Sequence, residues 1–455
     1  MKRALFLFFL LPSICASSGE GKPGGWRSKT ETAGPVHRAV KLVTDVMVHD
    51  IYSPPVVSRT YAYICVAGYE AALPGAQDYQ TLAGQLHGLA PLPKPDTAKE
   101  YSYSLAAVQA ILAVGRTMVI SDDSVMAFYQ GMLKEFHESG MPEEVYKNSI
   151  AWGQQVAGHI IAWSRSDNYR QTRTFARYAP STDPASWKPT PPAYFKAVEP
   201  NWNQIRTFLI DSAQQFKPPA ATPFSAEKGS DFYREALAVH DAGVAMSSEQ
   251  RLIANFWDCN PFKMNVNGHV MYASKKISPG GHWMNITKLA CRRKGADLMQ
   301  SLEAYACLAL ANADAFISCW DEKYRSVVIR PETYINQYID GNWTPLIQTP
   351  PFPEYTSGHS VISNASAVIL THLFGDRFAY IDSTETEFGL PSRRFSSFRQ
   401  AADEAAISRF YGGIHYMPSI NNGAVEGRLI GEYMLTHLVT RRKTGGRSQK
   451  AVTPF

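Results

Sequence analysis

The cysteines of this sequence do not form any of the pairs by which a metal site or a disulfide framework is usually recognised. There are six of them: Cys15, Cys65, Cys259, Cys291, Cys307 and Cys319. None belongs to a C-x-x-C pair, and several lie in segments with a helical pattern, so neither a zinc site nor a disulfide scaffold is predicted. Buried free cysteines are therefore the expectation.

The sequence also has little excess of either positive or negative charge. The formal net charge is only +5 over 455 residues, and the run of cations near the C-terminus, Arg441-Arg442-Lys443, is short, so no nucleic-acid-binding surface is predicted. We interpret residues 441–455 as a solvated basic tail. Beyond the N-terminus, no segment is expected to be long and apolar enough to cross a membrane. No strand alternation and no internal repeat compete with a helical pattern.

The first 17 residues have the pattern of an export signal. Met1-Lys2-Arg3 is followed by the apolar stretch A-L-F-L-F-F-L-L and by small residues up to Ser17. This stretch is too short to span a bilayer. We therefore expect an exported protein that is periplasmic or secreted. Lipid anchoring at Cys15 is the less favoured alternative, because Ile14 before it is larger than such sites usually hold.

Apolar residues recur at helical spacing through most of the chain, so the predicted fold class is all-α. A first helical region, 18–225, should end in a segment rich in proline and aromatic residues, 169–224, which we interpret as an ordered wrap over the helices. A second helical region, 226–440, should contain a long helix from about Thr287 to Tyr324. Both regions are expected to be closely packed helical bundles.

One stretch, P-P-F-P-E-Y-T-S-G-H-S, ends a proline-rich approach at a predicted helix N-terminus. Apolar residues at helical spacing follow His359, and Gly375 is a natural stop. Free backbone N–H groups at Ser357 and Gly358, together with the helix dipole, favour an anion there. His359 can transfer a proton near neutral pH. The alternative is an ordinary serine N-cap with no ligand.

Two further groups of residues could contribute to an anion site. Lys323 and Arg330 are seven positions apart, so they would project from one helix face if the helix persists, and Pro331 would favour its end. Arg409 lies at the end of a helical pattern, and His415 follows a glycine pair. Arginine offers a planar fork to oxyanion oxygens, and a neutral imidazole can act as nucleophile or ligand. Each group alone is equally consistent with a structural role.

Taken together, K-x6-R-P, S-G-H and S-R-x5-H in this order resemble the signature of the type 2 phosphatidic acid phosphatase and vanadium-dependent haloperoxidase superfamily. The segments S-W-K-P-T-P-P-A-Y-F and G-H-W-M-N-I are similar to its soluble bacterial haloperoxidase-type branch. The resemblance implies a helical fold whose motifs close around phosphate or vanadate. The implied oxyanion-binding residues are Lys323, Arg330, Ser357, Gly358 and Arg409.

The same resemblance gives the two histidines their implied roles. In a haloperoxidase, His415 would bind vanadate and His359 would assist proton transfer while hydrogen peroxide oxidises a halide. In an acid phosphatase of this superfamily, which needs no metal, His415 would form a phosphohistidine and His359 would protonate the leaving group of a phosphate ester or lipid phosphate. A non-catalytic phosphate-binding protein is a minor alternative. We favour the haloperoxidase, with small-molecule substrates only.

The chain departs from the family pattern at two positions. Thr356 replaces the usual proline before S-G-H but could still cap a helix. Ser419 replaces an aspartate that orients the last histidine, which weakens the case for a phosphatase; Asp403 or Glu404 could supply a carboxylate instead. Four residues are further candidates to line the mouth of the pocket: Trp283, His282, Phe352 and Tyr355.

Overall fold

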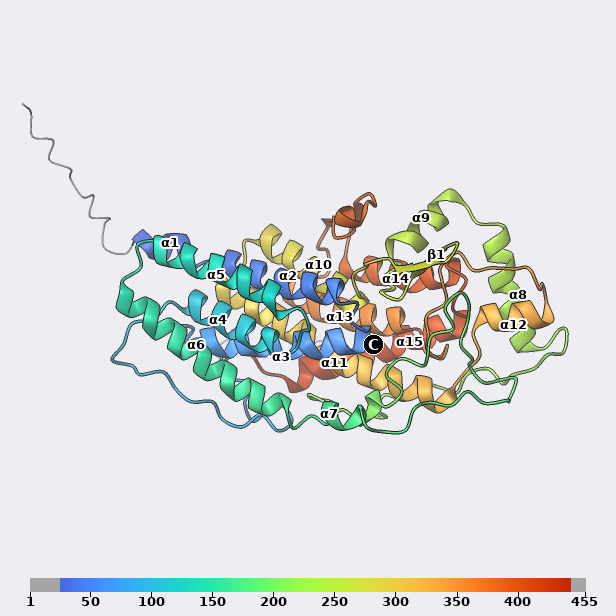
Figure 1. The fold of residues 1–455 in the computed structure, drawn as a ribbon, viewed down its shortest axis with the longest axis horizontal. Coiled ribbons are helices and arrows are strands. Elements are labelled where there is room, and N and C mark those ends of the chain that lie inside the picture. Colours follow the sequence, from blue (N-terminus) through green and yellow to red (C-terminus); the bar gives the residue numbers. More distant parts are fainter. Residues whose placement is uncertain (1–24, 443–455) are drawn as a thin grey trace, which may run out of the picture.

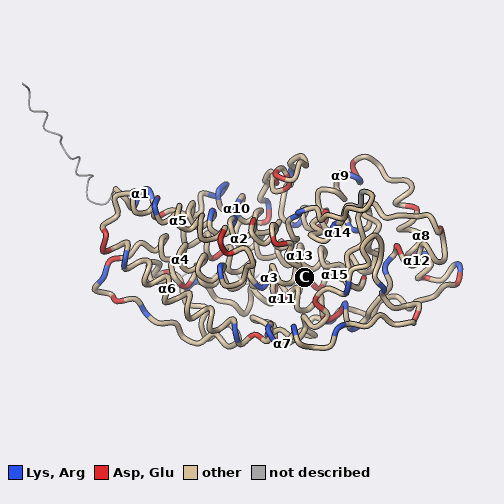
Figure 2. The backbone as a smooth tube through the Cα atoms, viewed as in Figure 1, with Lys and Arg blue, Asp and Glu red and all other residues tan. Residues whose placement is uncertain are grey.

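The computed structural model describes residues 25–442 (Figure 1). The predicted export signal, including Cys15, and residues 443–455 of the predicted basic tail lie outside the described residues. The molecule is elongated, with the N-terminal helices at one end and the C-terminal helices around the other. The cationic and anionic residues are interspersed along the chain (Figure 2), which agrees with the absence of blocked charge in the sequence.

Helices dominate both halves of the chain, as predicted. The first half contains α1 (Gly25–Thr30), α2 (Gly34–His49), α3 (Pro54–Ala72), α4 (Tyr103–Arg116), α5 (Asp122–Glu138), α6 (Glu143–Ser164) and the short α7 (Tyr169–Thr172). The second half contains α8 (Asp231–Val244), α9 (Ser248–Phe256), α10 (Pro279–Lys294), α11 (Leu298–Ser326), α12 (Pro331–Tyr338), α13 (Gly358–Phe374), α14 (Phe398–Tyr411) and α15 (Met417–His437).

Two small antiparallel hairpins interrupt the helical pattern. Strand β1 (Met264–Asn267) pairs with β2 (Val270–Ala273), and β3 (Tyr380–Asp382) pairs with β4 (Arg393–Phe395). No alternation of apolar and polar residues predicted these strands, because strands of three or four residues are too short to show a period of two. The all-α class is nevertheless confirmed.

Helix α11 forms the centre of the core, packed against α3 on one side and α13 on the other. By length and composition it is the one helix of residues 25–442 that could cross a membrane, which the sequence analysis had not recognised, and the whole apolar window is buried inside the protein. The predicted long helix from Thr287 is wrong. Gly295 closes α10 with φ 67°, and Asp297 opens α11 with a capping box completed by Gln300.

The predicted helical continuation from Lys323 to Arg330 is also wrong. Helix α11 ends at Ser326, and Val327 adopts a left-handed conformation with φ 50°. Arg330 is extended, with ψ 149°, because the following proline excludes the helical region for it. Pro331 therefore begins α12 instead of ending α11.

Helix α15 lies unusually close to α13, the helix that follows S-G-H. Its glycines Gly423, Gly427 and Gly431 repeat every fourth residue and so share one face. A Cβ atom at Gly427 would lie 2.1 Å from the backbone oxygen of Val361, so only glycine fits at this crossing. The close approach places Glu426 beneath the start of α13, where it accepts a hydrogen bond from Thr356 at 2.8 Å.

The segment 169–224 is largely irregular but well packed. Its backbone N–H groups at Phe208, Leu209 and Ile210 donate to the buried carboxylate of Asp314 in α11, at 2.7, 2.8 and 3.0 Å. Trp187 donates from its backbone nitrogen to Val327. The segment is thus held to the core through its own backbone groups, which accounts for its order without helices or strands.

At the C-terminal end of the described chain, the first two cations of the predicted basic tail make specific contacts. Arg441 forms an ion pair with the buried carboxylate of Glu303, and Arg442 donates to the backbone oxygen of Tyr79 at 3.0 Å. These two residues pack along the body of the protein.

Asp314→Asn should destabilise the protein by about 2–4 kcal/mol, because the amide presents an NH2 group to backbone donors that would lose their acceptor. The free energy of unfolding in urea measures this change. Glu227→Gln, at an exposed carboxylate in the following loop, is the control and should leave stability unchanged. An Asp314→Asn protein as stable as the parent would show that the carboxylate does not anchor segment 169–224.

A candidate oxyanion-binding site

The predicted anion-binding residues come together at the end of the bundle where α11, α13 and α14 meet. Ser357 is the N-cap of α13, as predicted, and its hydroxyl oxygen accepts from the Ser360 N–H at 3.4 Å. A small cavity of about 30 Å³ opens beside it. Its wall contains four of the predicted residues together with several aromatic rings. These four are Gly358, His359, Arg409 and His415.

Lys323 lies behind this wall, fully buried, and binds the loop that precedes α13. Its ammonium group donates to the carbonyl oxygens of Pro353 and Glu354 at 3.0 Å each and to that of Thr356 at 2.5 Å. Burial lowers the pKa of Lys323. All three protons of the ammonium group therefore bind carbonyls of the loop and hold its shape. The positive charge of Lys323 still acts on the cavity, since it helps to lower the pKa of His415.

Arg330 is the second buried cation at this loop. Its Nε donates to the Phe352 carbonyl at 2.9 Å and its Nη1 to the Ile414 carbonyl at 2.8 Å. The same Nη1 lies 3.2 Å from His415 Nε2. Although Lys323 and Arg330 do not share a helix face, both bind the same short loop, and this brings them together.

His415 is oriented by a carboxylate that the sequence analysis missed. Its Nδ1 lies 2.7 Å from Glu354 Oε1, which also accepts from the Tyr416 backbone N–H at 3.1 Å. Ser419 contributes only a longer contact to Nδ1, at 3.3 Å. The signal was present in the quoted stretch, where Glu354 is the one acidic residue. Its proximity to His415 depends on tertiary structure.

The two carboxylates suggested as substitutes for the aspartate that Ser419 replaces lie elsewhere. Glu404 accepts from Arg393 at 2.7 Å and from Trp257 Nε1 at 3.1 Å, so it is already paired. Asp403 makes no contact with His415 among the described residues. Both suggestions are therefore wrong, because helix α14 turns this part of its surface away from the cavity.

The protonation of the two histidines follows from their surroundings. Burial, reinforced by the charges of Arg330 and Lys323, lowers the pKa of His415 well below its usual value. A neutral ring that donates Nδ1–H to Glu354 keeps the lone pair on Nε2, which accepts from Arg330 Nη1 at 3.2 Å and which a ligand would take over from that donor. Burial and the charge of Arg409 likewise lower the pKa of His359. His359 is therefore neutral in this arrangement and can accept a proton.

Three nitrogen atoms around the cavity are buried and have no hydrogen-bond partner among the described residues. They are Arg330 Nη2, Arg409 Nε and His359 Nε2. Buried polar atoms without partners are costly, and the two arginine nitrogens are donors that suit a ligand with several oxygen atoms, while His359 Nε2 can serve as the acceptor beside them. The donor set therefore fits a tetrahedral oxyanion such as phosphate or vanadate.

Of the four residues predicted to line the mouth of the pocket, Phe352 is confirmed, and its ring lies 5.1 Å from the Arg330 guanidinium carbon. The other three do not line the cavity. His282 is fully buried in a separate cluster, Trp283 donates to Ser363 at 2.9 Å, and Tyr355 donates to the Pro219 carbonyl at 2.5 Å. Thr356 does not cap α13, because its hydroxyl donates to Glu426.

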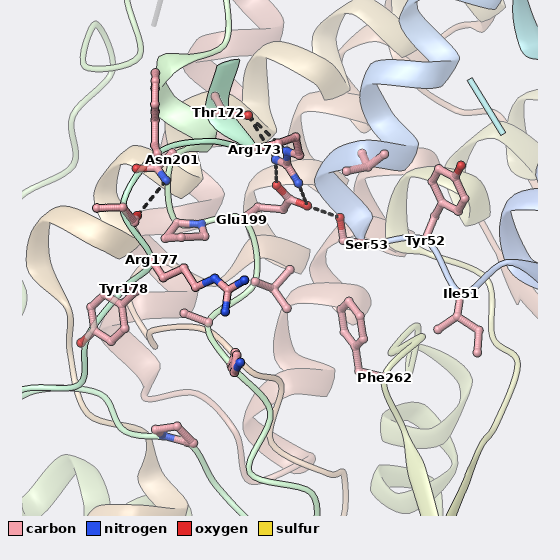
Figure 3. A pocket seen from close by; sticks show the side chains of 18 of the residues that line it. Ile51, Tyr52, Ser53, Thr172, Arg173, Arg177, Tyr178, Glu199, Asn201 and Phe262 are labelled. Atoms are coloured by element: carbon pink, nitrogen blue, oxygen red, sulfur yellow. Dashed lines mark hydrogen bonds and ion pairs between the residues drawn. The ribbon is translucent and has the colours of Figure 1, made fainter. Parts of the chain in front are cut away.

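A much larger cavity of about 840 Å³ adjoins the small one (Figure 3). Phe262 lines both. Two cations of segment 169–224 differ sharply within it: Arg173 is paired with Glu199, whereas Arg177 extends toward the middle of the cavity and makes no ion pair with a described residue. The larger cavity, which shares Phe262 with the anion site, therefore presents the positive charge of Arg177 without an ion-pair partner among the described residues.

Comparison with known proteins identifies the family. The model of the VCPO second helical-bundle domain matches residues 337–443. The crystal structure described as that of the first bacterial vanadium-dependent iodoperoxidase is 47% identical in sequence to this chain. That alignment covers 91% of this chain and 99% of the other, with a TM-score of 0.86.

More distant structures share the fold. The holo and apo forms of a bacterial vanadium-dependent chloroperoxidase are each 14% identical, with TM-scores of 0.65 and 0.63. Both alignments cover 85% of this chain, and 94% and 95% of the other chains. No curated protein sequence matches this chain. The extensive identity to the iodoperoxidase confirms the resemblance inferred from the three motifs, and the chain belongs to the bacterial vanadium-dependent haloperoxidase family.

Proposed function

We propose that this enzyme oxidises iodide with hydrogen peroxide, using vanadate bound in the cavity between His359, Arg409 and His415. The observation that supports this most directly is the set of three unpartnered buried nitrogens around a cavity that also presents His415 Nε2. The choice of iodide rests on the 47% identity to the iodoperoxidase. Bound vanadate supplies a Lewis-acidic centre that activates peroxide toward the halide.

Different residues around the cavity would bind the oxyanion oxygens, ligate vanadate and hold the loop in place. Arg330 and Arg409 offer Nη2 and Nε to oxyanion oxygens, and the Gly358 N–H at the start of α13 adds a further donor and the helix dipole. His415 offers Nε2 as the ligand atom, and Glu354 fixes the ring and its tautomer through Nδ1. Lys323 holds the loop that carries Glu354.

His359 is the residue suited to move the proton. Its Nε2 is shielded from solvent, unpartnered, and carries no positive charge because the pKa of the ring is lowered. It can therefore take a proton from a peroxide molecule entering the cavity and return it to a departing oxygen. Burial keeps the pKa of the ring low and the ring neutral, and repulsion from Arg409 adds to this effect.

Phosphate-ester hydrolysis is the second candidate, because the structure supplies the carboxylate whose absence had counted against it. A neutral His415 with Nδ1–H donated to Glu354 has the arrangement of an activated nucleophile. Phosphate and vanadate offer similar oxygen atoms to the same donors.

A paired assay on the purified protein tests both candidates. Iodide and bromide oxidation after vanadate loading should be lowered by about 10²–10⁴-fold in His415→Ala and in His359→Ala. His372→Ala, at an exposed position on the same helix α13, should behave as the parent. Metal-free hydrolysis of p-nitrophenyl phosphate without any halide oxidation would instead assign the site to a phosphatase.

Glu354→Gln should lower the affinity for orthovanadate by about 10–100-fold, since the amide no longer stabilises the Nδ1–H tautomer of His415. Calorimetric titration of the vanadate-free enzyme measures this without relying on turnover. Asp403→Asn is the matched control, because its carboxylate makes no contact with His415. Unchanged affinity in Glu354→Gln would remove Glu354 from the proposed site.

Arg177→Glu should lower kcat/KM for iodide by about 10-fold at low salt, because a positive charge in the larger cavity concentrates an anionic substrate. The difference should shrink at high ionic strength, where the charge is screened. Arg377→Glu carries the same charge change on an exposed residue just after α13 and is the control. Equal losses in both variants would indicate an effect of net charge only.

A further inference from the structure

A second cluster of reactive side chains lies beside the oxyanion cavity and plays no part in the function proposed above. It comprises Cys259 in the loop after α9, His282 in the first turns of α10, and Glu385 in the turn after β3. The exposed fractions of these residues are 2%, 0% and 4%. One donor atom from each lies within 4.8 Å of the other two.

The tautomer of His282 is fixed by two neighbours on the far side of its ring. Its Nε2 lies 2.8 Å from Asp382 Oδ2 and 2.6 Å from Thr384 Oγ1. The Thr384 hydroxyl donates its own proton to Asp382 Oδ1 at 2.7 Å, so toward His282 it acts as an acceptor. Nε2 therefore carries a proton, and a carboxylate behind a histidine in this way is the usual support of a metal-ligating ring.

The other ring nitrogen faces the two remaining side chains. Nδ1 of His282 lies 3.6 Å from Cys259 Sγ and 3.0 Å from Glu385 Oε1. In a tetrahedral zinc site with bond lengths of about 2.0–2.1 Å to nitrogen and 2.3 Å to sulfur, those two ligand atoms are separated by roughly 3.5 Å. The nitrogen–sulfur distance in this protein matches that separation.

Glu385 gives a further indication of a ligand. Its Oε1 is buried, and the one polar partner that it has among the described residues is His282 Nδ1 at 3.0 Å, the same nitrogen that faces Cys259. Buried carboxylate oxygens are normally paired with donors or coordinate a metal, because an unpaired buried charge is costly.

We propose that Cys259, His282 and Glu385 bind one zinc ion. The thiolate and the carboxylate balance the charge of Zn²⁺, neutral His282 supplies Nδ1, and the fourth position of the tetrahedron is left to a water molecule. A thiolate together with an imidazole selects zinc over magnesium or calcium, which prefer oxygen ligands.

The ion has a clear structural role at this place. The His282 ring stacks on Trp257, with centroids 4.5 Å apart, and the Trp257 carbonyl accepts from Arg409 Nη1 at 2.5 Å. Cys259 itself borders the oxyanion cavity. Zinc would thus fix the segment that orients Arg409, and its presence does not depend on which anion or substrate the enzyme uses.

Metal analysis of the full-length protein tests the proposal. Purified protein dialysed without chelator should contain about one zinc per chain by plasma mass spectrometry. Cys259→Ser and Glu385→Gln should lose most of it, whereas Cys307→Ser, at another buried cysteine in α11, should retain it. Circular dichroism confirms that the variants are folded.

Cobalt replacement in the unmodified protein tests the same site without mutation. Co²⁺ bound to a cysteine thiolate should give a sulfur-to-cobalt charge-transfer band in the near ultraviolet, which excess zinc removes. Absence of both zinc and the cobalt band would overturn the proposal and leave a buried imidazolium between two carboxylates. Zinc retained in folded Cys259→Ser and Glu385→Gln would overturn it as well, since the metal would then lie elsewhere.

Discussion

Four carbonyl oxygens of the loop 352–356 accept hydrogen bonds from two buried cations, and the catalytic end of the molecule depends on this interaction. Lys323 binds three of these carbonyls and Arg330 a fourth. An irregular loop with several prolines has few hydrogen bonds of its own, so its shape must be imposed from outside. The two charged donors impose it, and in doing so they place Glu354 against His415 and Ser357 at the start of α13.

Burying cations at this position has an electrostatic consequence. Lys323, Arg330 and Arg409 are each no more than 1% exposed. Three buried carboxylates lie near them: Glu354, Glu426 and Asp258, of which Asp258 is shared with a fourth cation, Lys276. An excess of buried positive charge is unfavourable unless a counter-charge occupies the same region. An oxyanion in the cavity supplies that counter-charge, so the fold and the ligand are mutually stabilising. Burial is the main cause of the lowered pKa values of both histidines, and the positive charge around them opposes a further proton as well.

The sequence predicted local features well and tertiary ones poorly. The N-cap at Ser357, the stop at Gly375 and the helical class depend on neighbouring residues, and the structure confirms all three. The break at Gly295 and Asp297 was equally local and could have been found from its capping box. The pairing of Glu354 with His415 joins residues 61 positions apart, and no periodicity indicates it. The cluster of Cys259, His282 and Glu385 has no recognised spacing for the same reason.

Segment 169–224 can reach its final packing only after residues much later in the chain have been synthesised. Its backbone groups bind Asp314 and Val327, and Val198 donates to the carbonyl of Pro351, so its partners are translated long after it. At about 5–20 residues per second, roughly 8–30 s pass between synthesis of Val198 and of Pro351. Through this interval the aromatic residues of the segment lack their final neighbours. The nascent chain is therefore most dependent on protection from aggregation before its last third has emerged.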